Sequence, residues 1–265
     1  MEIRRSFLRL AAMATFVGSA CAGGLWAQEK NKGTPKLTQE QLFQLSAVEK
    51  EYSERGAKTS RYVHDNAHWL ACNWPDATTD ESLVGLPDCP IPCNFDLVNC
   101  RVTDACIKEL KRVNGLRVLK LGGSQVTEAG IKELAGFSGL TMLELGVLRV
   151  SANTVKELSR LENLTHLDLI FSTADDAVVK ELMAFKKLND LNLRETKVTP
   201  AGLKMLRAHK SLKILRIGGP DVTDTWIADL KTLDNLEILS LDSSKVTDRG
   251  LTELRKALPK CYISK

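Results

Sequence analysis

A 24-residue repeat is the feature that most limits what this chain can fold into. Val-Thr phrases recur at this interval, with positions 150 and 174 filling the two gaps, and they begin at Val102, Val126, Val198, Val222 and Val246. Counted from the phrase start as zero, offsets 8, 14, 17 and 19 of the six full repeats hold Leu at 23 of 24 positions, and Ile217 is the exception. A single amphipathic helix does not keep this register across six units, so the pattern predicts an array of stacked units.

Each unit is predicted to contain one short strand and one short helix. Offsets 14, 17 and 19 read L-x-x-L-x-L, and the end of this phrase alternates with the period of a strand. Offsets 5, 8 and 11 recur at the spacing of one helix face, as in Ile107, Leu110 and Val113. Thr at offset 1 suits a helix cap, and an acidic residue at offset 2 suits the positively polarised first turn.

A unit of this kind cannot bury its leucines alone, so we expect the units to stack and to curve. Strands of a parallel sheet lie ~4.8 Å apart, whereas neighbouring helices need about 10 Å, so the strands must line the inside of a horseshoe. These features resemble the leucine-rich repeat family, specifically the exported bacterial V-T-D-x-G-L-x-x-L type, which is similar to the cysteine-containing subclass. The resemblance covers Leu83 to Lys265. It implies an α/β solenoid with a curved parallel sheet inside and helices outside.

The chain divides into three predicted parts. Residues 1–27 form an export signal, with a basic start, an apolar stretch and small-residue cleavage sites. Residues 28–82 are a linker and a helical N-terminal cap. Residues 83–265 form the leucine-rich repeat domain, with a degenerate first unit, six full repeats from Val102 and a truncated last unit from Val246.

The export signal predicts a periplasmic or extracellular protein. Arg4-Arg5 and the residues that follow resemble the twin-arginine export motif, and an ordinary signal peptide is the alternative. Lipid anchoring through Cys21 is disfavoured, because Gly18 stands where a lipoprotein signal has a branched apolar residue. The apolar part of the signal is too short to span a membrane, and no later stretch reaches the roughly 20 apolar residues of a membrane span.

The N-terminal cap is predicted to contain two helices. Thr38 and Gln41 form a capping box, and an apolar stripe from Leu42 to Tyr52 predicts a first helix that ends near Gly56. A second helix is expected from residue 59 to about residue 71. Two helices docked over the first strand would protect that edge of the sheet from pairing with other chains.

The second cap helix would also create candidate metal ligands. Spacing of four residues on a helix aligns His64, His68 and Cys72 along one side, and imidazole and thiolate are zinc ligands. A metal-binding or redox role of this segment is therefore the alternative function. Any disulfide formed after export is expected among Cys72, Cys89 and Cys93, because Cys261 lies about 30 Å away in the last unit.

The inner face of the predicted sheet carries the candidate binding residues. Offsets 16, 18 and 20 point away from the core, so their identity is not fixed by packing. Two interpretations remain open: a recognition patch for a protein or peptide, or a solvated face. The candidate partner-binding residues are Met142, Glu144, His166, Asp168, Ile170, Asp190, Asn192, Arg194 and Arg216.

Charge and motifs disfavour other functions. The formal charge is +4, from 37 basic and 33 acidic residues, and removal of residues 1–27 leaves 34 and 32, or +2, so no nucleic-acid partner is expected. Hydrolase, metalloprotease and nucleotide-binding motifs are absent, and His166 with Asp168 lacks an evident nucleophile. We therefore predict a non-enzymatic protein- or peptide-binding module without a cofactor, and the sequence favours no oligomeric state.

Overall fold

The computed structural model describes residues 34–265. The predicted export signal, with its twin-arginine phrase and Cys21, lies outside the described residues. Within this range one ten-stranded sheet follows chain order, antiparallel between its first two strands and parallel thereafter. The strands are β1 (Lys58–His64), β2 (Ala67–Asn73), β3 (Cys93–Asp96), β4 (Leu116–Lys120), β5 (Met142–Glu144), β6 (His166–Asp168), β7 (Asp190–Asn192), β8 (Ile214–Arg216), β9 (Ile238–Ser240) and β10 (Tyr262–Ser264).

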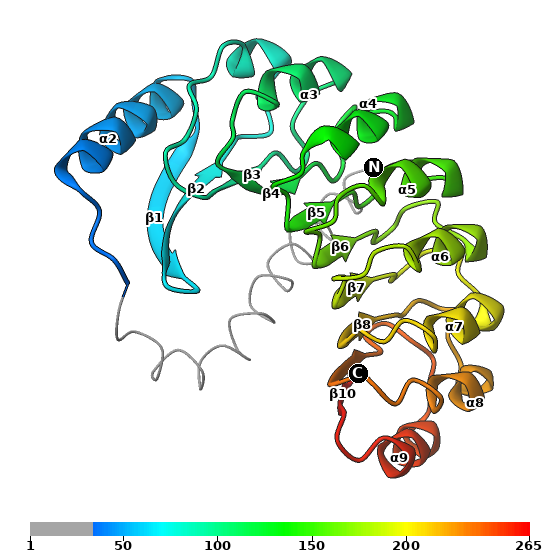
Figure 1. The fold of residues 1–265 in the computed structure, drawn as a ribbon. Helices are drawn as coiled ribbons and strands as arrows, with labels where there is room; N and C mark the ends of the chain where they lie inside the picture. Colours follow the sequence, from blue (N-terminus) through cyan, green and yellow to red (C-terminus); the bar gives the residue numbers. More distant parts are fainter. Residues whose placement is uncertain (1–33) are drawn as a thin grey trace.

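Helices cover the outer side of this sheet. Figure 1 shows the strands along the inside of an arc and the helices of the repeats along the outside, which confirms the predicted solenoid. The α-helices are α2 (Gln39–Glu54), α3 (Asp104–Leu110), α4 (Glu128–Glu133), α5 (Ala152–Leu158), α6 (Asp176–Leu182), α7 (Pro200–Leu206), α8 (Ile227–Leu230) and α9 (Asp248–Ala257). The 3-10 helices are η1 (Asp80–Leu83), η2 (Leu134–Gly136) and η3 (Asp224–Trp226).

The repeated leucines form one continuous core between the strands and the outer helices. Leu119, Leu143, Leu191 and Leu215, all at offset 17, are fully buried. Side chains alternate along a strand, so the neighbouring offsets 16 and 18 face the inside of the arc. Among residues 34–265, no helix combines the length and the apolar character that crossing a membrane requires.

A carboxylate ladder joins the outer helices of adjacent repeats. Each repeat helix begins after a capping residue at offset 1, as predicted, and Thr199 caps α7 in this way. The carboxylate of Asp176, at offset 2 of the preceding unit, accepts hydrogen bonds from the backbone N–H of Thr199 at 2.8 Å and from its hydroxyl at 2.6 Å. The same pair of contacts joins Asp80 to Thr103, Asp104 to Thr127, and Asp224 to Thr247.

The glycine of the V-T-D-x-G phrase makes room for this ladder. A Cβ atom at Gly202 would lie 2.2 Å from an Asp176 carboxylate oxygen, and one at Gly130 would lie 2.2 Å from Asp104. No side chain fits at that distance. The aspartate of one repeat therefore packs against the glycine of the next repeat. This contact explains why the V-T-D-x-G phrase contains both an aspartate and a glycine.

The prediction of the first cap helix is confirmed, and the prediction of the second cap helix is wrong. Helix α2 begins at the predicted Thr38 capping box and buries Leu45, Val48 and Tyr52. Residues 58–73, in contrast, form the β1–β2 hairpin rather than a helix. The hairpin does not dock over the edge of the sheet but extends the sheet, because β2 pairs with β3.

Two features of the sequence explain the hairpin. Asp65 and Asn66 both adopt positive φ, at 48° and 58°, which is the conformation that a tight two-residue hairpin turn requires and that Asp and Asn tolerate. The flanking runs are rich in aromatic and β-branched residues, and the cross-strand pair Tyr62 and Trp69 stacks with ring centroids 6.0 Å apart. These preferences override the helical spacing of the histidines.

The carboxylate ladder predicts a stability difference between two matched aspartates. Asp176→Ala removes two hydrogen bonds to the next repeat and should lower the free energy of unfolding by about 1 to 2 kcal/mol, as urea denaturation would measure. Asp248→Ala is the control, since Asp248 also begins a repeat helix, but among the described residues no hydrogen bond joins its carboxylate to the threonine cap of another unit. Both changes remove a helix N-terminal charge, so only the ladder separates them. Equal losses would contradict the ladder.

Candidate functional site

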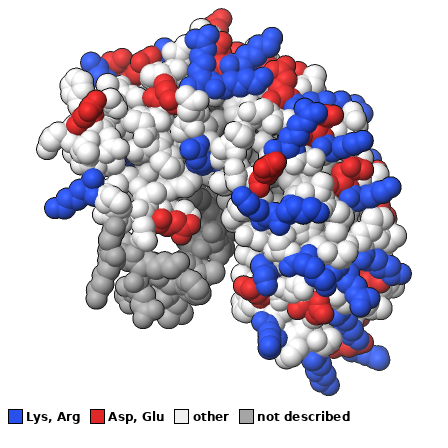
Figure 2. Space-filling model, viewed as in Figure 1, with Lys and Arg blue, Asp and Glu red and all other residues white. Residues whose placement is uncertain are grey.

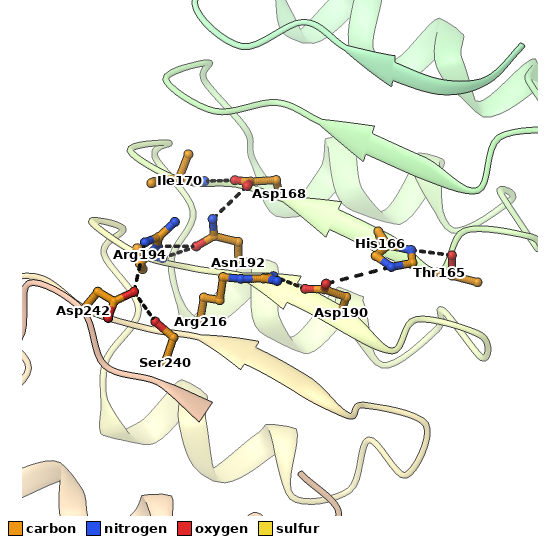
Figure 3. Close-up of polar contacts among 10 residues, drawn as sticks. All are labelled: Thr165, His166, Asp168, Ile170, Asp190, Asn192, Arg194, Arg216, Ser240 and Asp242. Atoms are coloured by element: carbon orange, nitrogen blue, oxygen red, sulfur yellow. Dashed lines mark hydrogen bonds and ion pairs between the residues drawn. The ribbon is translucent and has the colours of Figure 1, made fainter. Parts of the chain in front are cut away.

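The candidate residues lie side by side on the inner face of four neighbouring strands. The parallel register aligns Met142 with His166, Glu144 with Asp168, and Asp168 with Asn192. It also aligns His166 with Asp190, and Asn192 with Arg216. Strands β5 to β8, with the residues that follow β6 and β7, therefore bring the nine predicted residues into one lane, which we call the concave lane. Figure 3 shows those from His166 to Arg216.

The centre of the concave lane is a chain of hydrogen bonds. One oxygen of Asp168 accepts from the backbone N–H of Ile170 at 2.8 Å, and the other accepts from the Asn192 amide at 2.8 Å. The Asn192 oxygen in turn accepts from the backbone N–H and the Nε of Arg194, both at 3.2 Å. Each of these polar groups is thus paired with a neighbour from its own or the adjacent repeat (Figure 3).

Arg194 extends this chain toward the C-terminal repeats. Its guanidinium lies 3.6 Å from Asp242, whose carboxylate also accepts the Ser240 hydroxyl at 2.6 Å. Arg194 and Asp242 are two repeats apart, and the residue between them at the same offset is Gly218. A Cβ atom at Gly218 would lie 2.0 Å from the Asp242 carbonyl oxygen and 3.6 Å from Arg194 Cγ, so the glycine leaves room for the two charged groups to meet.

A second group of contacts centres on Asp190. Arg216 donates a hydrogen bond to Asp190, and the Nε2 atom of His166 lies 3.9 Å from the same carboxylate. Burial lowers the pKa of His166, as do the nearby Arg216 and His64, whereas Asp190 opposes this shift. The carboxylate that His166 contacts is therefore that of Asp190 on the next strand, because the register of the sheet aligns these two residues.

The Thr165 hydroxyl beside His166 is hydrogen-bonded to the backbone of the neighbouring repeat. Thr165 contacts His166 Nδ1 at 2.7 Å, but the Thr165 hydroxyl also donates to the carbonyl of Thr141 at 3.0 Å. One repeat earlier, the Thr141 hydroxyl donates to the carbonyl of Arg117 in the same way. The threonine hydroxyl is thus a repeated structural contact, and no activated nucleophile results.

Glu144 is a buried carboxylate of the concave lane with a strongly raised pKa. It is 7% exposed, and its neighbour on the next strand, Asp168, is another carboxylate. Burial and the adjacent Asp168 raise the pKa of Glu144 to about 8, and Lys120 partly opposes them. Lys120 itself forms an ion pair with Asp96 at 3.2 Å.

Sequence reasoning did not select three of the charged groups that complete this network. Lys120, Asp96 and Asp242 lie outside the predicted patch, although they occupy offsets 18 and 20 of other repeats. The 24-residue spacing contains the signal, because residues 24 positions apart are neighbours on adjacent strands. On the face shown in Figure 2, positive and negative side chains are interspersed over the repeats rather than separated.

The network leaves little of the predicted patch exposed. Ile170 is buried, and its Cγ2 would lie 2.9 Å from a Cβ at Gly146, so it fills the space above that glycine. Glu144, Asp190 and Asn192 are also buried. Met142, His166 and Asp168 keep partial exposure. The inner face is therefore a pre-organised polar surface with a few accessible groups.

Apolar side chains stand exposed at the rim of the concave lane. Offset 21 has positive φ in every unit from Asn99 to Ser243, and Gly or Asn suits this conformation. Val147 and Phe171 adopt it nonetheless, at 69° and 55°, and they remain 37% and 39% exposed. The two residues are 24 positions apart and so lie on adjacent repeats. The backbone segments that hold them are in contact, since the N–H of Val147 donates to the carbonyl of Ile170. Two exposed apolar side chains are thus held in a costly backbone conformation.

The structure does not bring the candidate metal ligands together. Paired residues of a hairpin share a face, and the pairs His64–Ala67 and Val63–His68 place the two histidines on opposite faces. Cys72 is buried, and His68 contacts the carbonyl of Pro35 at 3.1 Å. Within residues 34–265, no three His, Cys, Asp or Glu side chains are arranged to hold a metal ion. The helical alignment behind this alternative is wrong.

Comparison with known proteins identifies the fold. No protein-family model and no curated protein sequence matches the chain. Internalin C2 from Listeria monocytogenes strain 4b F2365 aligns with 83% of this chain and 91% of its own, at 19% identity and a TM-score of 0.51. An internalin, InlF, from the same strain aligns with 65% of this chain and 53% of its own, at 16% identity and a TM-score of 0.43. The likeness to internalin C2 supports the leucine-rich repeat fold.

The raised pKa of Glu144 predicts that stability falls as pH rises. Between about pH 5 and pH 8 the folded protein retains a proton on Glu144 that the unfolded chain has released, so stability declines by up to about 1.4 kcal/mol per pH unit. Glu144→Gln removes the titrating carboxyl group. Urea denaturation across this pH range should then show a smaller decrease of the free energy of unfolding with pH. Glu237→Gln, at an exposed ion pair with Lys213, should leave the slope unchanged. A steep slope in the Glu144→Gln protein would contradict the assignment.

Proposed function

We propose that this protein binds a protein or peptide ligand through the concave lane and its apolar rim. The observation that carries the proposal is the exposure of Val147 and Phe171 in the left-handed conformation next to the polar network. An exposed β-branched or aromatic residue there costs stability and gains nothing from the fold. Contact with a ligand is a function that would explain why such a residue is kept at this position.

Shape and chemistry support a macromolecular ligand. From β3 to β9, seven strands at ~4.8 Å give an inner face about 34 Å long, and three outward positions span roughly 13 Å. The area of this face, with the concave lane at its centre, is therefore about 450 Å². A standard interface takes ~800 Å² from each partner, so a narrow peptide fits the lane alone. A larger protein would also contact the rim residues Val147 and Phe171. The pre-formed hydrogen bonds reduce the entropy lost when such a ligand binds.

We infer that the protein is not an enzyme and that it acts outside the cytoplasm. The Thr165 hydroxyl and His166 belong to the repeated contacts of the sheet, so they do not form an activated nucleophile. The sequence of residues 1–27 supports export to the periplasm or the medium. The mixed charge of the chain disfavours nucleic acid as the ligand.

The proposal predicts that substitutions of the rim residues Val147 and Phe171 weaken ligand binding without lowering stability. Replacing both residues, as Val147→Gly and Phe171→Gly, relieves two unfavourable backbone conformations and should leave unfolding free energy unchanged or raise it by up to about 1 kcal/mol per site. The same protein, immobilised and exposed to an envelope extract of the source organism, should retain less than about a third of the ligand captured by the unaltered chain.

Ser243→Gly provides the matched control. Ser243 occupies the same offset and has the same positive φ, but it lies three repeats beyond Phe171, in the last full unit. This change should affect stability in the same direction and leave capture unchanged. Equal capture by the unaltered protein and by the Val147/Phe171 variant would contradict the proposed binding surface.

A further inference from the structure

Two buried cysteines flank a short proline-containing segment before the first parallel strand. Cys89 and Cys93 enclose Pro90-Ile91-Pro92, and both side chains are buried, at 3% and 0% exposure. They are thiols in the structure, as is the neighbouring Cys72. Neither the polar network of the concave lane nor the rim uses them.

The backbone before Cys89 is held by two contacts. The hydroxyl of Tyr52 in helix α2 donates to the carbonyl of Pro87 at 2.8 Å. The carboxylate of Asp88 accepts from the Asn114 amide at 2.9 Å and from the backbone N–H of Gly115 at 3.3 Å. These contacts tie the segment both to the cap and to the turn that precedes β4.

Two backbone hydrogen bonds also fix the chain at Cys93. Its N–H donates to the carbonyl of Gly115 at 2.8 Å, and the carbonyl of Pro92 accepts from the N–H of Leu70 in β2 at 2.9 Å. Pro90 and Pro92 each fix φ within the segment. Both cysteines are therefore fixed in position by contacts that do not depend on a bond between them.

The two side chains meet in this arrangement. The N–H of Cys93 donates to the Gly115 carbonyl at 2.8 Å, and the Cys89 Cβ lies against the same glycine, so both cysteines pack at one point. Gly115 lies against the segment, and a Cβ there would approach Cys89 Cβ to 3.1 Å and the Cys89 carbonyl to 2.6 Å, so no side chain fits at that point. The neighbouring Cys93 thiol lowers the pKa of Cys89, whereas burial raises the pKa of Cys93.

We propose that Cys89 and Cys93 form a disulfide in the exported protein. The oxidant is a protein or small-molecule disulfide of the oxidising compartment. The Cys89 thiolate attacks one sulfur of that disulfide and releases a thiolate, which leaves a mixed disulfide on Cys89. The Cys93 thiolate then attacks the Cys89 sulfur and releases the second thiolate. The two protons of the cysteine thiols end on the two released thiols, so two cysteines are oxidised and one external disulfide is reduced.

Cys72 is the competitor that a test must distinguish. It is as buried as the other two, and its thiol lies near enough to Cys89 to raise the pKa of Cys72, although burial is the larger cause. In the sheet, however, Cys72 is paired with Phe95, whereas Cys93 is paired with Leu70.

The sequence provides a direct readout of the pairing. Cleavage on the N-terminal side of aspartates releases residues 88–95, which contain Cys89 and Cys93 but no other cysteine, whereas Cys72 falls in residues 65–75. The full chain, reduced and unfolded, is refolded in excess oxidised glutathione, alkylated under denaturing conditions and digested. Fragment 88–95 should be lighter by two hydrogens, and alkylation of it should fall at least about tenfold relative to a pre-reduced sample. Two alkylated cysteines in that fragment, or a link to residues 65–75, would overturn the proposal.

Two substitutions strengthen this test. Cys72→Ser removes the competing thiol from the same buried cluster and should leave the closed 88–95 fragment unchanged. Cys93→Ser should leave Cys89 alkylated without prior reduction. Loss of the closed fragment in the Cys72→Ser protein, with refolding verified by circular dichroism, would show that Cys72 takes part in the bond and would contradict the assigned pair.

Discussion

The leucines of each repeat can be buried only by the neighbouring repeats. One short strand and one short helix leave an apolar face open to water, and burial of a leucine side chain contributes roughly 1.5 to 3 kcal/mol. Stacking closes this face, and the strand spacing of ~4.8 Å against wider helices then requires curvature. The curved sheet, the outer helices and the concave lane all follow from this requirement, since each strand must repeat the register of the one before it.

The same constraint determines which polar contacts repeat. Asp176 and Thr199 meet because stacking places offset 2 of one helix beside offset 1 of the next. On the inner face, residues 24 positions apart become neighbours, so the identity of each side chain decides whether a hydrogen bond, an ion pair or an uncompensated charge results. Glu144 beside Asp168 is the case in which two carboxylates meet and raise the pKa of Glu144.

The sequence predicts well what stacking controls and less well what depends on local competition. The strands, the caps and the membership of the concave lane follow from the 24-residue period. The β1–β2 hairpin does not, because His64, His68 and Cys72 have helical spacing while Asp65-Asn66 favours a tight turn, and the pairing of β2 with β3 decides between them. The partner of His166 was missed for a similar reason: Asp168 is closer in sequence, but Asp190 is its neighbour in the sheet.

Removal of one complete unit tests most directly the central claim that 24 residues form the structural unit. Deletion of residues 174–197 joins two positions that are consecutive in the repeat and places β6 beside β8. We predict that this protein unfolds in one cooperative transition and keeps its circular dichroism per residue. Deletion of residues 174–185 removes half a unit, breaks the register and should abolish the transition. If both deletions lose structure to the same extent, the repeat is not the unit of folding and the account is wrong.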